Sequence, residues 1–134
     1  MTSQFNHLQI NIEPSAMPFY KELFALLGWP VIHEDERFLG VGTSAASFWF
    51  MAAPGKSVTD YDQRGVNHVG IAVGTQADVD TVTDFLNGKG IPALFETPRH
   101  RPEFSAGPDD TYYQVMFESP DKVLFEAVYR GPRG

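Results

Sequence analysis

The feature that most constrains the fold of this chain is an internal repeat. The segment NHLQINI at residues 6–12 aligns with NHVGIAV at residues 67–73, 61 positions later, and both keep the Asn-His pair and the aliphatic alternation. Apolar residues at every second position predict a β-strand in both segments. Because a repeated unit of this length is one supersecondary module, we expect two related modules in sequence.

The residues after each of these strands also correspond. Helical spacing of apolar residues follows Ser15 in the first half and Thr75 in the second, so both residues are predicted helix caps. Gly28 and Gly88 are the predicted helix stops. Three more strands are expected in each half, beginning after GWP at residues 28–30 and GIP at residues 90–92; the last two are predicted at residues 38–43 and 47–53 in the first half and at 112–118 and 123–129 in the second.

The sequence therefore predicts an α+β fold of tandem βαβββ modules. Module 1 covers about residues 1–53, a polar linker covers 54–64, and module 2 covers about 65–134, all within a single domain of ordinary size. Residues 98–110 contain three prolines and form a long irregular stretch. Loops of this length inside compact domains are more often functional than simple connections.

Charge and composition narrow the class of ligand. The formal net charge is −7, which disfavours nucleic acid and anionic membranes as partners. The chain has no cysteine, so any metal must be held by histidine, carboxylate or water. No basic and apolar leader opens the sequence and no long apolar run follows, so we expect a cytoplasmic protein.

Strand alternation places three potential metal ligands on the faces that do not pack on a helix. His7 and His68 are related by the repeat, and Glu126 lies on the predicted last strand. Two neutral imidazoles and one carboxylate can bind Fe(II), Mn(II), Co(II), Ni(II) or Zn(II) and leave coordination positions open. The alternative interpretation is that each of these residues is an ordinary hydrogen-bonded or solvated side chain.

At this point the sequence resembles the vicinal oxygen chelate superfamily, which includes glyoxalase I, extradiol dioxygenases, fosfomycin-modifying thiol transferases and metal-free bleomycin-binding proteins. NHL at residues 6–8 resembles the opening strand motif of that superfamily. FY at 19–20 with LLGW at 26–29 resembles its first-helix motif, and FESPDKVLFE at 117–126 resembles its closing hairpin. The resemblance covers nearly the whole chain.

The resemblance implies a cup-shaped mixed sheet with helices on the outside, often completed by a second chain, so a homodimer is expected. It also implies that His7, His68 and Glu126 hold a divalent ion and that Met51 occupies the fourth ligand position. Because a thioether is a weak donor for such ions, a three-ligand chemistry is favoured over that of glyoxalase I. The expected function is a dioxygenase- or lyase-like enzyme that binds a small substrate through vicinal oxygens; the alternatives are a metal-free drug-binding protein and a fosfomycin-type thiol transferase.

A few other polar and aromatic residues are candidates for contacts with the substrate. They are Gln9 and Asn11 on the face of His7, Trp49 on the face of Met51, and Arg101 in the irregular loop. The alternatives are a hydrogen-bonded polar patch, a core aromatic ring and a solvated charge run. Tyr112 and Tyr113 alternate faces, so at most one reaches the site; Tyr113 is the predicted acid, beside Glu126 as the catalytic carboxylate.

Overall fold

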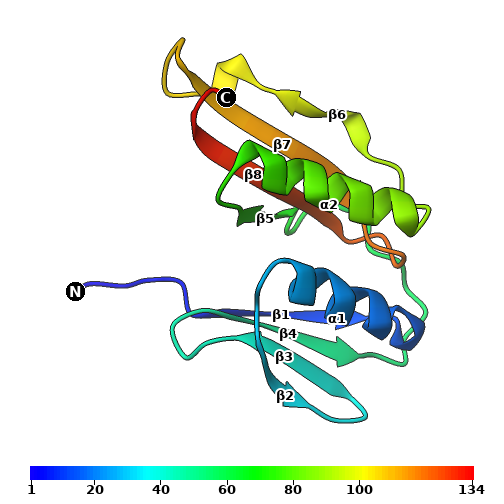
Figure 1. The fold of residues 1–134 in the computed structure, drawn as a ribbon. Coiled ribbons are helices and arrows are strands. Elements are labelled where there is room, and N and C mark those ends of the chain that lie inside the picture. The colour runs from blue at the N-terminus through cyan, green and yellow to red at the C-terminus, as the bar shows by residue number, and fades with distance from the viewer. The chain divides into compact units, whose positions relative to one another are not determined.

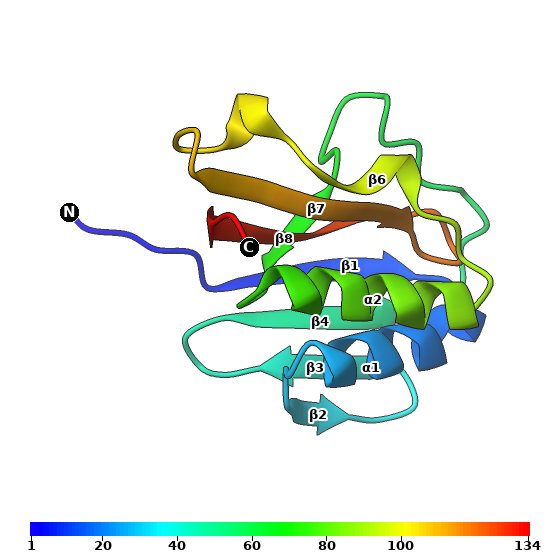
Figure 2. The ribbon, with the colours of Figure 1, turned by 45° about the horizontal axis from the view of Figure 1, so that its top comes forward.

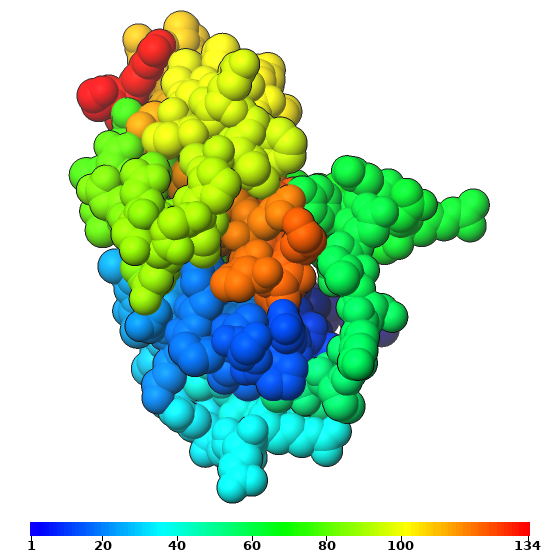
Figure 3. Space-filling model, turned by 90° about the vertical axis from the view of Figure 1, so that its right-hand side faces the viewer, coloured from blue at the N-terminus to red at the C-terminus, as the bar shows by residue number.

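A computed structural model describes all residues, 1–134, and divides the chain into two compact units. Unit 1 comprises Met1–Val58 and unit 2 comprises Thr59–Gly134, so the boundary falls inside the predicted linker. Residues 54–60 lack regular structure and are exposed; they belong to the green segment in Figure 3. No helix has the length and apolar content needed to cross a membrane.

Unit 1 has the predicted order of strand, helix and three strands (Figure 1). Its elements are β1 (His7–Ile12), the 3-10 turn η1 (Pro14–Ala16), α1 (Met17–Leu26), β2 (Val31–Glu34), β3 (Phe38–Gly42) and β4 (Ser47–Ala52). The strands form one sheet in the order β1-β4-β3-β2, in which β1 and β4 are parallel and the other pairs are antiparallel. One face of the sheet packs on α1 through a cluster of buried aromatic rings that includes Tyr20, Phe24, Phe48 and Phe50.

Unit 2 repeats this arrangement. Its elements are β5 (Val69–Ala72), α2 (Gln76–Gly88), β6 (Leu94–His100), the 3-10 turn η2 (Pro102–Phe104), β7 (Asp110–Glu118) and β8 (Leu124–Pro132). The sheet order is β5-β8-β7-β6, again with one parallel pair, β5 and β8 (Figure 1). Figure 2 shows β6, β7 and β8 from another direction. Helix α2 contacts β6, β7 and β8, so it covers one face of the sheet and leaves the other face to the polar residues. The α+β class and the repeated element order are therefore confirmed.

The helix ends show where the sequence prediction was right and where it was wrong. Thr75 caps α2, because its hydroxyl accepts a hydrogen bond from the amide of Asp78 at 3.1 Å. Ser15 does not cap α1, because it already lies inside the 3-10 turn through which the chain enters that helix. The second helix stop is Gly90, with φ of +71°, and not Gly88, which is the last helical residue.

The irregular stretch predicted at residues 98–110 is shorter than expected. Strand β6 continues to His100, and the turn η2 follows directly after Arg101. The strand does so despite Pro98 because Arg99 and His100 pair again with β7 after a shift of register that begins at Leu94. The connection that remains between β6 and β7 covers residues 101–109. Its residues Arg101 and Phe104 line the cavity described below.

Candidate functional site

A cavity of about 540 Å³ lies on the face of the second sheet that α2 does not cover. Strand alternation selects its lining, because Tyr112, Gln114 and Met116 point to one side of β7 while Val115 and Phe117 are buried on the other. The lining also includes Tyr61, Asp62, Asn67, His68, Phe95, Arg101, Phe104, Leu124, Glu126 and Arg130. All of these residues belong to unit 2.

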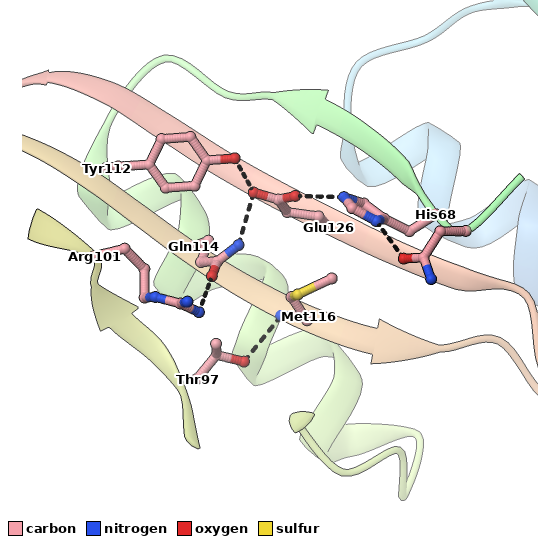
Figure 4. Close-up of polar contacts among 8 residues, drawn as sticks. His68, Thr97, Arg101, Tyr112, Gln114, Met116 and Glu126 are labelled. Carbon is pink, nitrogen blue, oxygen red and sulfur yellow. Dashed lines mark hydrogen bonds and ion pairs between the residues drawn. The ribbon is translucent and has the colours of Figure 1, made fainter. Parts of the chain in front are cut away.

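Glu126 is the buried charge at the centre of this site, with only 4% of its surface exposed. Its Oε1 accepts hydrogen bonds from the Tyr112 hydroxyl and from Gln114 Nε2, the latter at 2.7 Å (Figure 4). Its Oε2 faces His68 Nε2 at 3.1 Å. Burying a carboxylate is costly unless its oxygens have hydrogen-bond partners, and these three side chains provide them for Glu126.

The two donors to Oε1 are themselves fixed. Burial, reinforced by the hydrogen bond to Glu126, raises the pKa of Tyr112 to about 12, so the phenol keeps its proton at neutral pH. The amide of Gln114 is oriented by Arg101, whose Nη1 donates to Gln114 Oε1 at 3.0 Å. Arg101 in turn donates from Nε to Glu103 Oε1 at 2.6 Å. Oε1 is therefore committed to protein donors, and Oε2 is the oxygen left for another partner.

The orientation of His68 follows from its neighbour Asn67. The Asn67 amide group donates from Nδ2 to the carbonyl of Tyr61 at 2.9 Å, which turns Asn67 Oδ1 toward His68 Nδ1 at 2.8 Å. An amide oxygen can only accept, so Nδ1 must carry the proton. Without a second proton, His68 Nε2 then presents a lone pair toward Glu126 Oε2.

The same arrangement occurs independently in unit 1. Asn6 Nδ2 donates to the carbonyl of Ser44 at 3.3 Å, and Asn6 Oδ1 lies 2.7 Å from His7 Nδ1. His7 therefore also carries a proton on Nδ1. The repeated Asn-His pair thus has a physical function, since the asparagine fixes the tautomer of the histidine that follows it.

These donors have the chemistry of a divalent metal site. Two facing atoms that both offer lone pairs, His68 Nε2 and Glu126 Oε2, repel each other unless a proton or a cation lies between them. An Nδ1-protonated imidazole with an oriented carboxylate is the usual ligand form for Zn(II) and for first-row transition ions. The residues present therefore fit a metal ion, although no group of three histidine, aspartate or glutamate side chains is assembled in the structure.

Tyr113, the tyrosine predicted to be the catalytic acid, does not point toward Glu126. Tyr113 points to the helix side of β7, where its hydroxyl donates to Asp80 of α2 at 2.7 Å. Tyr112 is the tyrosine that reaches Glu126, because adjacent residues of a strand face opposite sides and Tyr112 shares the face of Gln114. Arg101 lines the cavity, and its role in substrate binding stays a prediction.

The candidates in unit 1 lie on the face of the sheet that carries His7. Gln9 Nε2 donates to Asn11 Oδ1 at 3.3 Å and approaches Met51 Sδ at 3.9 Å. Trp49 donates from its indole nitrogen to Ser47 Oγ at 3.1 Å. These residues form a polar patch with one aromatic ring, and their role in substrate binding stays a prediction.

The strand register replaces Met51 with Trp49 as the counterpart of Glu126. In unit 2, Glu126 pairs with Gly70, two residues after His68. In unit 1, the residue two positions after His7 is Gln9, and it pairs with Trp49. The alignment of the last strands by sequence was wrong by two residues, which strand alternation does not reveal because it preserves the face. An indole therefore stands where a fourth ligand would be.

Several residues of the site were not predicted from the sequence. Gln114 donates to Glu126, Arg130 lines the cavity and Asn67 orients His68, while Tyr112 was named only beside the preferred Tyr113. A signal for Gln114 exists, since it is a polar residue next to the apolar run Val115-Met116-Phe117 in a buried strand. The pairing of Tyr112 with Arg130 depends on the register of β7 and β8 and is not visible in the sequence.

No protein-family model and no curated protein sequence matches this chain. Solved structures do match. A Bacillus halodurans protein provisionally assigned as a glyoxalase superposes with a TM-score of 0.77 at 22% identity, over 94% of this chain and 95% of its own. A glyoxalase/bleomycin resistance protein from Albidiferax ferrireducens T118 gives a TM-score of 0.74 at 18% identity, over 96% and 100% of the two chains. A glyoxalase/bleomycin resistance protein/dioxygenase family enzyme from Burkholderia phytofirmans PsJN gives 0.64 at 13% identity, over 95% and 98%.

These similarities extend over the full length of both partners and show the fold. The chain has the fold of the glyoxalase/bleomycin resistance/dioxygenase proteins, as the sequence motifs predicted. A shared fold at this level of identity does not select a reaction, because proteins with one fold carry different sites.

Proposed function

We propose that this protein is a metal-dependent enzyme of the glyoxalase/dioxygenase kind, with His68 and Glu126 as ligands of one divalent ion. The observation that carries the proposal is the approach of His68 Nε2 to Glu126 Oε2 at 3.1 Å, combined with the protonated Nδ1 that Asn67 imposes. His7 is the proposed third ligand, since the repeat gives it the same tautomer.

A divalent ion at this site would act as a Lewis acid on a substrate with two neighbouring oxygens, in a dioxygenase- or lyase-like reaction. The contribution of the chain itself is positioning. Tyr112 and Gln114 hold Oε1 of Glu126 and leave Oε2 for the ion. The Tyr112 phenol, with its pKa near 12, serves as a hydrogen-bond donor and not as a base at neutral pH.

The direct test is the metal content of protein purified without added metal, together with its melting temperature before and after chelation. We expect about one Fe, Mn, Co, Ni or Zn ion per complete site and a melting temperature that falls on chelation and recovers on adding the ion, because a ligand of the folded state stabilises it. Protein that holds no ion and does not respond to any of these metals would exclude the proposal.

A second candidate function is a metal-free binding protein, and one observation favours it. The contact of 3.1 Å between His68 Nε2 and Glu126 Oε2 is within hydrogen-bonding distance, so Glu126 has a partner on each oxygen without an ion. The cavity would then bind an organic molecule on its aromatic side chains. In that case ligand-induced stabilisation does not change when a chelator is present.

The role of Asn67 gives a more specific prediction. Replacing Asn67 with alanine removes the acceptor for His68 Nδ1, so the imidazole loses its fixed tautomer and orientation. Loss of such an outer partner typically weakens metal binding by about 10- to 100-fold. Calorimetric titration with Zn(II) and with Mn(II) measures the effect.

Two variants make this test specific. Asn67→Asp keeps an acceptor oxygen for Nδ1 and should retain most of the affinity. Asn87→Ala removes the same amide from an exposed position in α2 and should bind metal like the wild type. Equal affinities of the wild type and Asn67→Ala would show that the asparagine does not position the histidine.

A further inference from the structure

One arginine that lines the cavity of unit 2, Arg130, is exposed and has no carboxylate partner in the protein. Arg130 lines the cavity and lies over the ring of Tyr112, with 6.0 Å between its guanidinium carbon and the ring centroid, and it forms no ion pair. Arg101, the other arginine of the lining, is committed to Glu103 and Gln114. Because guanidinium groups bind carboxylates through paired hydrogen bonds, an arginine without a carboxylate partner in a cavity is suited to an anionic ligand.

The register of the sheet places this arginine at a defined distance from the proposed metal ligand. Arg130 and Glu126 share one face of β8, four residues apart, which is about 13 Å along an extended strand. Tyr112 pairs with Arg130 across the two strands, and its hydroxyl reaches Glu126. The tyrosine side chain therefore spans the interval between the cation and the carboxylate, and a ligand lying along it would need about the length of one substituted ring.

The walls of the cavity favour a flat apolar body between the two ends. Phe104 packs edge-on to Tyr112 with 5.4 Å between ring centroids, yet 52% of its surface is exposed. Phe95 also borders the cavity and is 53% exposed. Its backbone, with φ of +56°, lies in the left-handed region that disfavours side chains other than glycine. Exposed aromatic rings and a strained backbone gathered around one cavity are features of a binding site.

The charges that face the cavity agree with this interpretation. The lining carries two carboxylates, Asp62 and Glu126, and two arginines, of which Arg101 is offset by Glu103. Arg130 is therefore the lining arginine that has no carboxylate partner and that can accept an anion.

We propose that the cavity binds a small aromatic carboxylate, with the carboxylate on Arg130, the ring along Tyr112 and the opposite end at Glu126 and His68. This inference deepens the proposed function, on which it rests only for the chemistry at the Glu126 end. The anion site on Arg130 does not require the metal, so the two can be tested separately.

The test compares two probes of the same shape and different charge. Chelator-treated protein is titrated calorimetrically with 4-hydroxybenzoate and with its neutral analogue 4-hydroxybenzamide. We expect the wild type to prefer the carboxylate by about tenfold or more, which is the range of a charge-assisted hydrogen bond. Arg130→Gln should lose this preference, and Arg130→Lys should keep part of it.

The matched control is Arg133→Gln, which makes the same charge change three residues further on and outside the cavity lining. It should keep the preference of the wild type. The inference is overturned if the wild type shows no preference, if Arg130→Gln retains it, or if Arg133→Gln loses it equally. Circular dichroism confirms that each variant is folded, and elemental analysis of the same preparations tests the metal proposal independently of these outcomes.

Discussion

Protein with Glu126 replaced by glutamine is expected to purify without metal and to show no change of melting temperature on adding the ion. Glutamine keeps the size of the side chain and a carbonyl oxygen that can accept from Tyr112 and Gln114. It removes the charge that a divalent ion requires and places an NH2 group where Oε2 faces His68. Loss of one of so few protein ligands should lower the affinity by at least about 100-fold, beyond the effect of an outer partner. Elemental analysis and thermal melting measure both effects.

The control for this variant is Glu36→Gln, which neutralises an exposed carboxylate between β2 and β3. It should keep the metal content and melting temperature of the wild type. If Glu126→Gln binds the ion as tightly as the wild type does, Glu126 is a structural carboxylate and not a ligand of the ion.

The second large effect concerns the stability of unit 1. Replacing Phe50 with alanine should destabilise this unit by about 3–5 kcal/mol, because the ring is fully buried and its removal leaves a cavity. The ring of Phe50 stacks on Tyr20 at a centroid distance of 4.6 Å and contacts Phe24 at 5.1 Å. Urea denaturation followed by intrinsic fluorescence and circular dichroism measures the change.

Phe5→Ala is the matched control, since Phe5 is 58% exposed and lies before β1. Its effect should stay within about 0.5 kcal/mol of zero. Because the chain forms two compact units, a separate unfolding transition for unit 2 that does not move in Phe50→Ala would show that the units unfold independently. A Phe50→Ala protein as stable as the wild type would contradict the packing described for α1 and its sheet.

The sequence predicted most of the fold because the relevant signals are local. Alternation in β1 and β5, the Thr75 cap and the repeated Asn-His pair all depend on residues close together in the chain. The errors fell where local signals compete. Ser15 was predicted as a cap from its residue type, but a 3-10 turn contains it. Gly88 was predicted as the stop, but the left-handed position is Gly90.

For the candidate site as well, some features follow from local sequence and others only from the tertiary structure. The sequence by itself determined that His68 and Glu126 share a polar face of one module, that His7 is the repeat partner of His68, and that cysteine plays no part. The tertiary structure decided which tyrosine reaches the carboxylate, that Trp49 and not Met51 corresponds to Glu126, and that Arg130 lies over Tyr112. The physical reason is register: alternation along one strand fixes the face of a side chain, but only hydrogen bonding between strands fixes its neighbours.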